Sequence, residues 1–152
     1  MSGERIPTVL LIAPERFTRR LSAAAAARSI GRGLESRGWA CDLCPIGEQE
    51  CPIGGQDGDP RSLLDAVDFD RRLRSARALV TGTGRLSRHS LAGGWLFEVA
   101  TRARQSGVPC YAIVGEDALD AFDKRILDLD VVLEAASAGE LERAGAALAA
   151  LL

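Results

Sequence analysis

Hydrophobic residues of this chain fall into two alternating patterns. Short runs of consecutive apolar residues are typical of strands that are buried on both faces of a sheet. Longer stretches, with apolar residues three and four positions apart, are typical of helices that bury one face. The predicted strands cover 8–13, 40–46, 78–81, 108–115 and 131–134, and the predicted helices cover 22–38, 62–76, 90–106, 118–127 and 137–151.

This order of elements gives five strand–helix units. Long connections that contain a helix favour parallel strands with right-handed crossovers and helices on both faces. We expect an α/β fold with a doubly wound, mainly parallel five-stranded sheet in the flavodoxin-like order 2-1-3-4-5. In such sheets ligands bind outside the carboxyl ends of the strands where the strand order reverses, here between the first and third strands.

Two helices carry more specific expectations. Leu119, Phe122 and Ile126 have the spacing of a buried face in helix 118–127. The acidic run Asp65, Asp68 and Asp70 in helix 62–76 is interpreted as a solvated face rather than a metal site, because carboxylates three residues apart seldom bind a metal without other ligands.

The composition is that of an ordinary globular domain. With 152 residues and 16.1 kDa, 47% apolar residues and 26% charged residues, the chain is long enough for one domain with a full core. No apolar run approaches the roughly 18 residues of a membrane span, and the first residues lack the apolar core of a signal peptide. We therefore expect a cytoplasmic protein without a membrane partner. The net charge of −2 gives no general attraction to nucleic acid.

Four cysteines raise the question of a metal or redox site. Cys41, Cys44 and Cys51 are closely spaced, Cys110 is distant, and the single histidine is His89. A structural zinc site needs four ligands, usually as two pairs, and strand residues three apart point to opposite faces. We interpret the cysteines as reduced, buried or loop thiols in preference to a metal or redox site, and we predict no metal ligands.

Arginine is concentrated in the two loops that this fold would bring together, 14–21 and 82–90. Of the nineteen Lys and Arg residues eighteen are Arg, whose guanidinium binds planar oxyanions through paired hydrogen bonds. Backbone N–H groups at the helix starts that follow both loops also favour anions, and Gly82 and Gly84 would let a ligand approach the backbone. One reading is a pocket for phosphate or carboxylate formed by Arg16, Arg19, Arg20, Arg85, Arg88 and His89.

The other reading of the same loops is structural. The arginines would then extend into solvent or pair with Glu15, Glu48 and Glu50. His89 has no acidic residue beside it in the sequence, so we interpret it as a hydrogen-bonding residue rather than a catalytic base.

Common catalytic motifs are missing from the sequence, and the catalytic residues stay unknown. The only lysine is Lys124, so the chain has no phosphate-binding P-loop. The first loop lacks the glycines of a dinucleotide fingerprint, and Thr81 stands where a response regulator would need an aspartate. The chain also lacks a serine-nucleophile elbow.

Two blocks of the sequence resemble the bacterial two-domain glycerate kinases. Residues 9–23 (VLLIAPERFTRRLSA) are similar to that family's opening strand and the motif Ala-Pro-Asp-Ser-Phe-Lys-Gly-Ser-Leu-Ser-Ala. Residues 78–94 (ALVTGTGRLSRHSLAGG) are similar to its motif Leu-Val-Ile-Thr-Gly-Glu-Gly-Arg-Leu-Asp, with further matches in 69–73 and 102–110. The positions that match in place are Thr81, Gly82, Gly84, Arg85, Leu86, Ser90 and Gly93.

The resemblance implies a Rossmann- or flavodoxin-like domain that a large second domain interrupts in that family. It also implies the use of ATP and Mg²⁺ to phosphorylate glycerate between the two domains. Here the chain passes from Pro45 through a glycine-rich loop to Phe69. We therefore expect residues 1–152 to be the first domain alone, with a deletion junction near 51–60.

The polar positions of the motifs differ from the family more than the apolar positions do. The first motif has lost its lysine, and Thr83 and Ser87 replace the acidic residues of the later motif. Phosphoryl transfer needs positioned cations and carboxylates that hold Mg²⁺. Without the second domain, moreover, the substrate would stay exposed to water.

We therefore expect a degenerate domain that binds a small anion, a carboxylate or phosphate, at the switch point without competent kinase chemistry. One alternative is a minimal phosphotransferase that uses ATP and Mg²⁺, with Glu15 or Glu48 replacing the lost acids. Another is a protein-interaction or regulatory module, including a homodimer. The expected ligand-binding residues are Glu15, Arg16, Arg19, Thr81, Gly82, Thr83, Gly84, Arg85, Ser87, Arg88 and His89.

Overall fold

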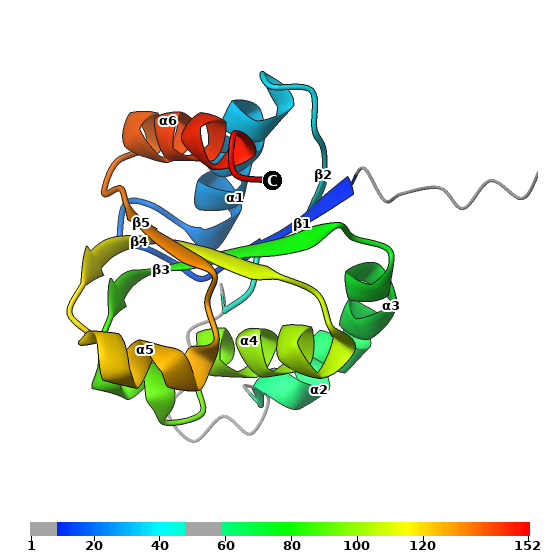
Figure 1. Ribbon diagram of the computed structural model, residues 1–152, viewed down its shortest axis with the longest axis vertical. Coiled ribbons are helices and arrows are strands. Elements are labelled where there is room, and N and C mark those ends of the chain that lie inside the picture. Colours follow the sequence, from blue (N-terminus) through cyan, green and yellow to red (C-terminus); the bar gives the residue numbers. More distant parts are fainter. Residues whose placement is uncertain (1–8, 48–58) are drawn as a thin grey trace, which may run out of the picture.

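The computed structural model describes residues 9–47 and 59–152, and its centre is one parallel sheet. The strands follow the order β2-β1-β3-β4-β5, and every neighbouring pair is parallel (Figure 1). This is the strand order and the doubly wound class that the sequence predicts. The strands are β1 (Val9–Pro14), β2 (Ala40–Leu43), β3 (Ala78–Leu86), β4 (Cys110–Asp117) and β5 (Val131–Glu134).

Helices cover both faces of this sheet (Figure 1). One face carries α1 (Ala23–Glu35) and α6 (Ala138–Ala149). The other face carries α2 (Pro60–Ala66), α3 (Phe69–Arg74), α4 (Trp95–Ser106) and α5 (Ala121–Leu127), with a 3-10 turn, η2 (Arg88–Leu91), before α4. None of these helices, within the part of the chain that the structure describes, is long and apolar enough to cross a membrane.

Each face of the sheet has its own apolar core. Alternate residues of a strand point to opposite faces, so the uninterrupted apolar runs of the central strands fill both cores. Leu10 and Ile12 of β1 pack toward α1 and α6, whereas Leu11 and Ala13 pack toward α4. Val80 and Leu79 of β3 divide between the two cores in the same way.

The packing of α1 against α6 brings the two helix backbones into contact. A Cβ atom at Gly33 would lie 2.0 Å from the carbonyl oxygen of Glu142 and 2.7 Å from the amide nitrogen of Ala146. A Cβ atom at Gly145 would lie 2.5 Å from the carbonyl oxygen of Ile30. Neither position has room for a side chain, so these glycines set the distance between the helices.

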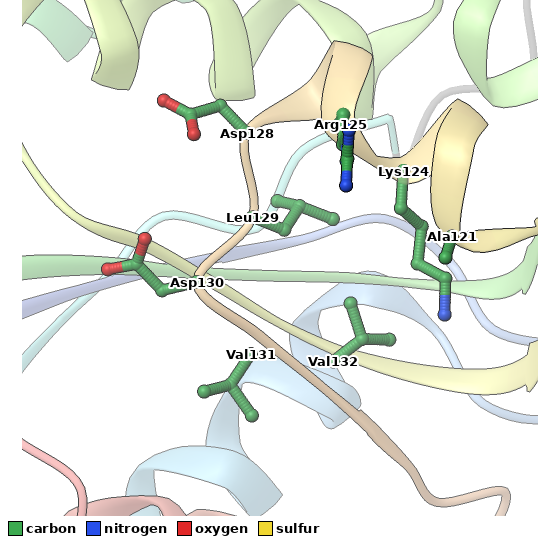
Figure 2. A pocket seen from close by; sticks show the side chains of 8 residues that line it. All are labelled: Ala121, Lys124, Arg125, Asp128, Leu129, Asp130, Val131 and Val132. Atoms are coloured by element: carbon green, nitrogen blue, oxygen red, sulfur yellow. The ribbon is translucent and has the colours of Figure 1, made fainter.

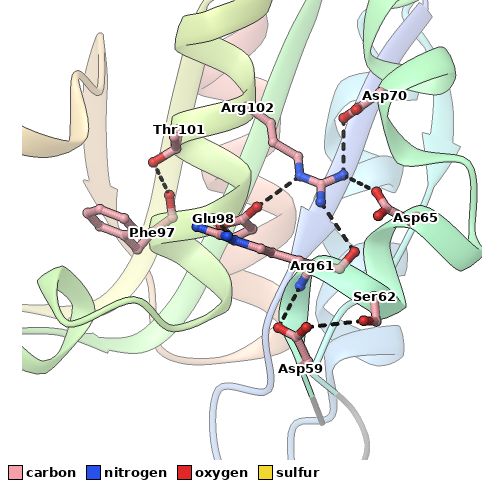
Figure 3. Close-up of polar contacts among 9 residues, drawn as sticks. All are labelled: Asp59, Arg61, Ser62, Asp65, Asp70, Phe97, Glu98, Thr101 and Arg102. Atoms are coloured by element: carbon pink, nitrogen blue, oxygen red, sulfur yellow. Dashed lines mark hydrogen bonds and ion pairs between the residues drawn. The ribbon is translucent and has the colours of Figure 1, made fainter. Parts of the chain in front are cut away.

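A largely buried arginine on α4 binds residues of both α2 and α3. The side chain of Arg102 is 11% exposed. It donates hydrogen bonds to Glu98 at 3.1 Å, Asp65 at 2.9 Å, Asp70 at 3.1 Å and the Arg61 carbonyl at 3.2 Å (Figure 3). Asp65 and Asp70 are exposed, as the prediction of a solvated face requires, but they also bind this guanidinium.

Three predicted boundaries are wrong. The predicted helix 62–76 is two helices, because Asp68 between them has φ +59° and turns the chain. The segment 82–86 was expected to be a loop, yet it continues β3, where Thr83 pairs with Val114 and Arg85 with Glu116. The α-helix that was expected from residue 90 starts at Trp95, after η2.

The predicted buried face of α5 is also wrong. Phe122 is 73% exposed and Ile126 is 46% exposed, whereas Leu119 and Leu127 are buried. The helix starts only at Ala121, where the Asp120 side chain accepts a hydrogen bond from the Asp123 N–H at 2.8 Å. Leu119 therefore precedes the helix, and a helical spacing counted from it points to the wrong face. The start predicted for the last helix is confirmed, because Ser137 caps it through the Glu140 N–H.

Candidate functional site

The carboxyl ends of β1 and β3 lie side by side at the point where the strand order reverses. Pro14 pairs with Gly82, and the Glu15 N–H donates to the Gly82 carbonyl at 2.8 Å. The Phe17 ring lies 3.0 Å from the place where a Cβ atom of Gly82 would be. The two segments that the sequence singles out are thus neighbours in the fold, although more than sixty residues separate them.

A cavity of about 220 Å³ opens beside this junction, and we call it the β1/β3 hollow. Its walls come from the end of β1, the end of β3, the η2 turn and the start of α4. Five of the predicted ligand-binding residues line it, namely Glu15, Thr83, Arg85, Ser87 and His89. The remaining lining residues are Ser90, Gly94, Trp95 and Leu96.

Three of the other predicted residues pack within the sheet instead. Thr81 is fully buried, and its hydroxyl donates to the Ala13 carbonyl at 2.8 Å. A Cβ atom at Gly84 would lie 2.0 Å from the Phe17 carbonyl oxygen, and one at Gly82 would lie 2.2 Å from that of Ile113. The glycines of this motif therefore admit neighbouring backbone, not a ligand as the sequence suggests.

The predicted arginines separate into different surroundings. Arg85 lines the β1/β3 hollow and lies 3.5 Å from Glu116, and both side chains are largely exposed. Arg88 points to α5, where it lies 3.6 Å from Asp123. Arg19 is exposed, and Arg16 is half-buried, with an Nε atom that has no hydrogen-bond partner within 9–47 and 59–152. The possible partners Glu48 and Glu50 lie outside the described residues.

Glu15 gives the hollow a carboxyl group among its cationic and hydroxyl side chains. It accepts hydrogen bonds from the Thr83 hydroxyl and the Leu96 N–H. Burial raises the pKa of Glu15 above its ordinary value of 4.5, and this effect outweighs the two hydrogen bonds, which lower it. The β1/β3 hollow is therefore not lined by positive charge alone.

The two serines of the η2 turn are held by a reciprocal capping arrangement. Ser87 Oγ accepts from the His89 N–H at 3.3 Å, and Ser90 Oγ accepts from the Ser87 N–H at 3.1 Å. A hydroxyl that accepts a hydrogen bond still has its own hydrogen to donate. With Arg85 and His89, these hydroxyls form a set of donors on one side of the hollow.

The described residues around the hollow offer few ligands for a divalent cation. Within the described part of the chain, no three His, Cys, Asp or Glu residues are grouped so that they could hold a metal ion. Among residues 9–47 and 59–152, Glu15 is the one carboxylate that lines the hollow, and it accepts hydrogen bonds from Thr83 and Leu96. Because burial also favours its protonated form, Glu15 is a poor ligand for a divalent cation.

The described cysteines are free thiols. Cys44 and Cys110 are buried, and Cys41 is half-buried, with its Sγ 3.9 Å from the Gly31 carbonyl oxygen. Burial raises the pKa of Cys41 to about 11, and it raises the pKa of Cys44 and Cys110 as well. Thiols with such pKa values stay protonated and unreactive at neutral pH. Cys51 lies outside the described residues.

The fold and the position of the hollow are those of a doubly wound α/β protein with a site at its switch point. The model of the glycerate kinase family matches residues 60–151, which is more than half of the chain. The chain therefore belongs to the glycerate kinase family.

Solved structures give two further comparisons. A putative glycerate kinase 2 from Salmonella typhimurium LT2 is 19% identical over 60% of this chain, with a TM-score of 0.45, and the match spans only 26% of that longer chain. A diflavin flavoprotein A3 from Nostoc sp. is 15% identical, with a TM-score of 0.50 over 95% of this chain and 92% of that chain, which is a likeness of fold alone. A comparison with curated protein sequences finds no match.

Four lining residues were missing from the predicted site. Ser90 lies in the motif shared with the family, so its position was a usable signal. Trp95 and Leu96 fall inside the helix 90–106 that the sequence predicts, more than one turn from its expected start. Since α4 starts at Trp95, these residues lie in the first turn of the helix and line the hollow.

Proposed function

We propose that this domain binds a small anion, a carboxylate or a phosphate ester, in the β1/β3 hollow. The observation that carries the proposal is the presence of Arg85, His89 and the hydroxyls of Ser87 and Ser90 around one cavity. Guanidinium and hydroxyl donors are the usual partners of oxyanions in proteins. The cavity lies where doubly wound sheets bind their ligands.

The size of the hollow favours a small metabolite. A cavity of about 220 Å³ has room for a three-carbon acid or its phosphate ester. Phosphate, glycerate and phosphoglycerates are therefore the probes of choice.

The proposal includes the loss of kinase chemistry. Thr83 and Ser87 line the hollow where the family motif has acids, and Glu15 is hydrogen-bonded and disposed to protonation. Residues 1–152 would then correspond to the first domain of the family and act in the cytosol, with the free thiols Cys41, Cys44 and Cys110 suited to a reducing compartment.

Isothermal titration calorimetry with phosphate and glycerate tests the proposal. Arg85→Ala should lower the affinity about tenfold, since a charge-assisted hydrogen bond is worth about 1.5–3 kcal/mol. Arg88→Ala is the matched control, because this neighbouring exposed arginine faces Asp123 and not the hollow. The absence of binding at millimolar concentrations, or equal losses in both variants, would contradict the proposal.

A coupled ATPase assay with Mg²⁺ and glycerate separates binding from catalysis. We expect no turnover above the background of a buffer blank. Turnover that Arg85→Ala abolishes would support the alternative of a minimal phosphotransferase and overturn the loss of kinase chemistry.

A further inference from the structure

A second cavity, of about 230 Å³, lies between the end of β2, helix α2 and the start of α4, and we call it the apolar cleft. Apolar residues and one glycine line it. Val67 in its wall is 43% exposed, although this side chain is as large as many that are buried elsewhere in the fold. The lining residues are Pro45, Ile46, Gly47, Leu63, Leu64, Ala66, Val67 and Trp95.

The apolar cleft and the β1/β3 hollow share a wall. The half-buried Trp95 lines both cavities. A Cβ atom at Gly47, in the cleft, would lie 3.0 Å from Cδ1 of this indole, so backbone packs directly against the ring. The Ile46 N–H donates to the Pro14 carbonyl at 3.0 Å, which places the cleft segment next to Glu15 of the hollow.

Helix α2, which forms the far wall of the cleft, is held in place. Leu64 is fully buried, and Asp65 and the Arg61 carbonyl of α2 both bind Arg102 of α4 (Figure 3). The Asp59 side chain accepts from the Arg61 N–H at 3.2 Å and caps the start of the same helix. The two walls of the cleft are therefore fixed relative to each other by α2–α4 contacts.

We propose that the ligand is an amphiphilic anion, with its charged head in the β1/β3 hollow and a single ring or a short branched chain in the apolar cleft. The inference rests on the proposed function and adds the chemical class of the ligand. A cavity of about 150 Å³ is enough to bind benzene, so the cleft has room for one ring. Trp95 supplies a flat apolar surface between head and ring, and the lining offers an anion no cationic partner in the cleft itself.

Matched pairs of acids test this division. Titration calorimetry compares acetate with 3-phenylpropionate, and phosphate with benzyl phosphate. Removing the apolar surface of one ring from water predicts that the ring-bearing member of each pair binds at least about tenfold more tightly. Equal affinities within a pair would overturn the inference and leave the proposed function in place.

Two variants test whether the ring of the ligand occupies the apolar cleft. Ala66→Phe fills the cleft from an exposed helix position, so it should abolish the ring advantage and leave acetate and phosphate binding unchanged. Arg85→Ala should weaken both members of each pair alike. A ring advantage that survives in Ala66→Phe would overturn the assignment to the cleft, and failure of all four probes to bind would contradict the proposed function itself. Circular dichroism spectra and urea midpoints equal to those of the unchanged protein show that both variants fold.

Discussion

The two helical layers of this domain are packed in different ways. The layer of α1 and α6 is packed through glycines, with backbone against backbone at Gly33 and Gly145. The layer of α2, α3 and α4 is joined by the charged Arg102, whose acidic partners Asp65 and Asp70 stay in contact with solvent (Figure 3). The first layer leaves no room between its helices, whereas the β1/β3 hollow and the apolar cleft both lie on the side of the second layer.

This difference shows how a small parallel domain can combine rigidity with a site. Close-packed interiors tolerate no added atoms, and this holds where α1 meets α6, although a cavity of about 350 Å³ lies between α6 and β5. Side chains that meet at a distance through hydrogen bonds leave space for cavities between them. In this fold, that space adjoins the switch point, where a ligand can also meet the ends of β1 and β3.

The largest effect is expected from filling the α1–α6 contact. Gly33→Ala should lower the free energy of unfolding by about 3 kcal/mol or more, because its Cβ would lie 2.0 Å from the Glu142 carbonyl oxygen. Gly139→Ala is the matched control in α6, since the nearest atom to its Cβ would be Arg143 Nη1 at 3.6 Å. Urea unfolding should show a neutral to slightly stabilising effect there. A small loss in Gly33→Ala would mean that the helices can separate.

A smaller loss of stability is expected when the charge of Arg102 is removed. Arg102→Met removes the closer of the two cationic partners of Glu98, which is 15% exposed, and breaks the hydrogen bonds of α4 to Asp65, Asp70 and the Arg61 carbonyl, while the longer contact of Arg61 with Glu98 remains. We expect a loss of about 2 kcal/mol in urea unfolding, less than for a fully buried pair because Asp65 and Asp70 can be hydrated. Arg104→Met, which removes only an exposed contact to the Ile126 carbonyl, should change stability by less than about 0.5 kcal/mol. Equal stability losses in the two variants would mean that Arg102 does not hold α2 and α3 against α4.

Glu15 should give the β1/β3 hollow a pH dependence opposite in sign to that of Glu140 in α6, whose pKa is lowered by the hydrogen bond from the Ala136 N–H. Because burial raises its pKa, the contribution of Glu15 to stability is complete below pH 4.5 and declines as the pH rises through the raised pKa. Glu15→Gln should therefore match the unchanged protein in acid and exceed its stability at neutral pH. Phosphate binding should also weaken over the same pH range in the unchanged protein and less so in Glu15→Gln, as calorimetry at several pH values can show. The opposite order of stabilities at neutral pH would contradict the assignment.

The smallest effect is expected on the outside of α5. Phe122 is 73% exposed, so Phe122→Ser should change the free energy of unfolding by less than about 0.5 kcal/mol. Leu127→Ala, at a position that is 2% exposed in the same helix, should unfold at clearly lower urea concentration. A large loss in Phe122→Ser would mean that another surface covers this residue.

A further cavity at α5 lies on the edge of the sheet, away from the switch point (Figure 2). It is bounded by Lys124 and Arg125 of α5 and by Val131 and Val132 of the edge strand β5. Lys124 is already in contact with Asp117, at 2.5 Å.

The order of the strands could be predicted from the sequence because it depends on the apolar pattern and on connection length. The start of a helix could also be predicted where the sequence has a capping residue, as at Ser137. The extent of β3 was not predictable, since Gly82 and Gly84 have the composition of a loop. These glycines are needed because the backbone carbonyl groups of Phe17 and Ile113 lie against them in the folded state.

The candidate site was predictable only in part for the same reason. The sequence groups residues by loop, so it assigns Arg16, Arg19 and Arg88 to the site together with Arg85. Which of them reaches the hollow depends on the start of α4 and on pairs such as Arg88 with Asp123, which form only between elements distant in the sequence. Trp95 joins the two cavities for a reason that a single sequence does not contain, namely the approach of Gly47 to its ring.

The most direct test of the account is an NMR titration of the ¹⁵N-labelled protein with phosphate. Backbone amides of Thr83, Ser87, His89 and Ser90 should shift in a saturable manner with one dissociation constant, and those of Gly33 and Gly145 should not move. Arg85→Ala should weaken this response and Arg88→Ala should leave it unchanged. Shifts centred on any other part of the surface, or no saturable shifts, would contradict the assignment of anion binding to the ends of β1 and β3.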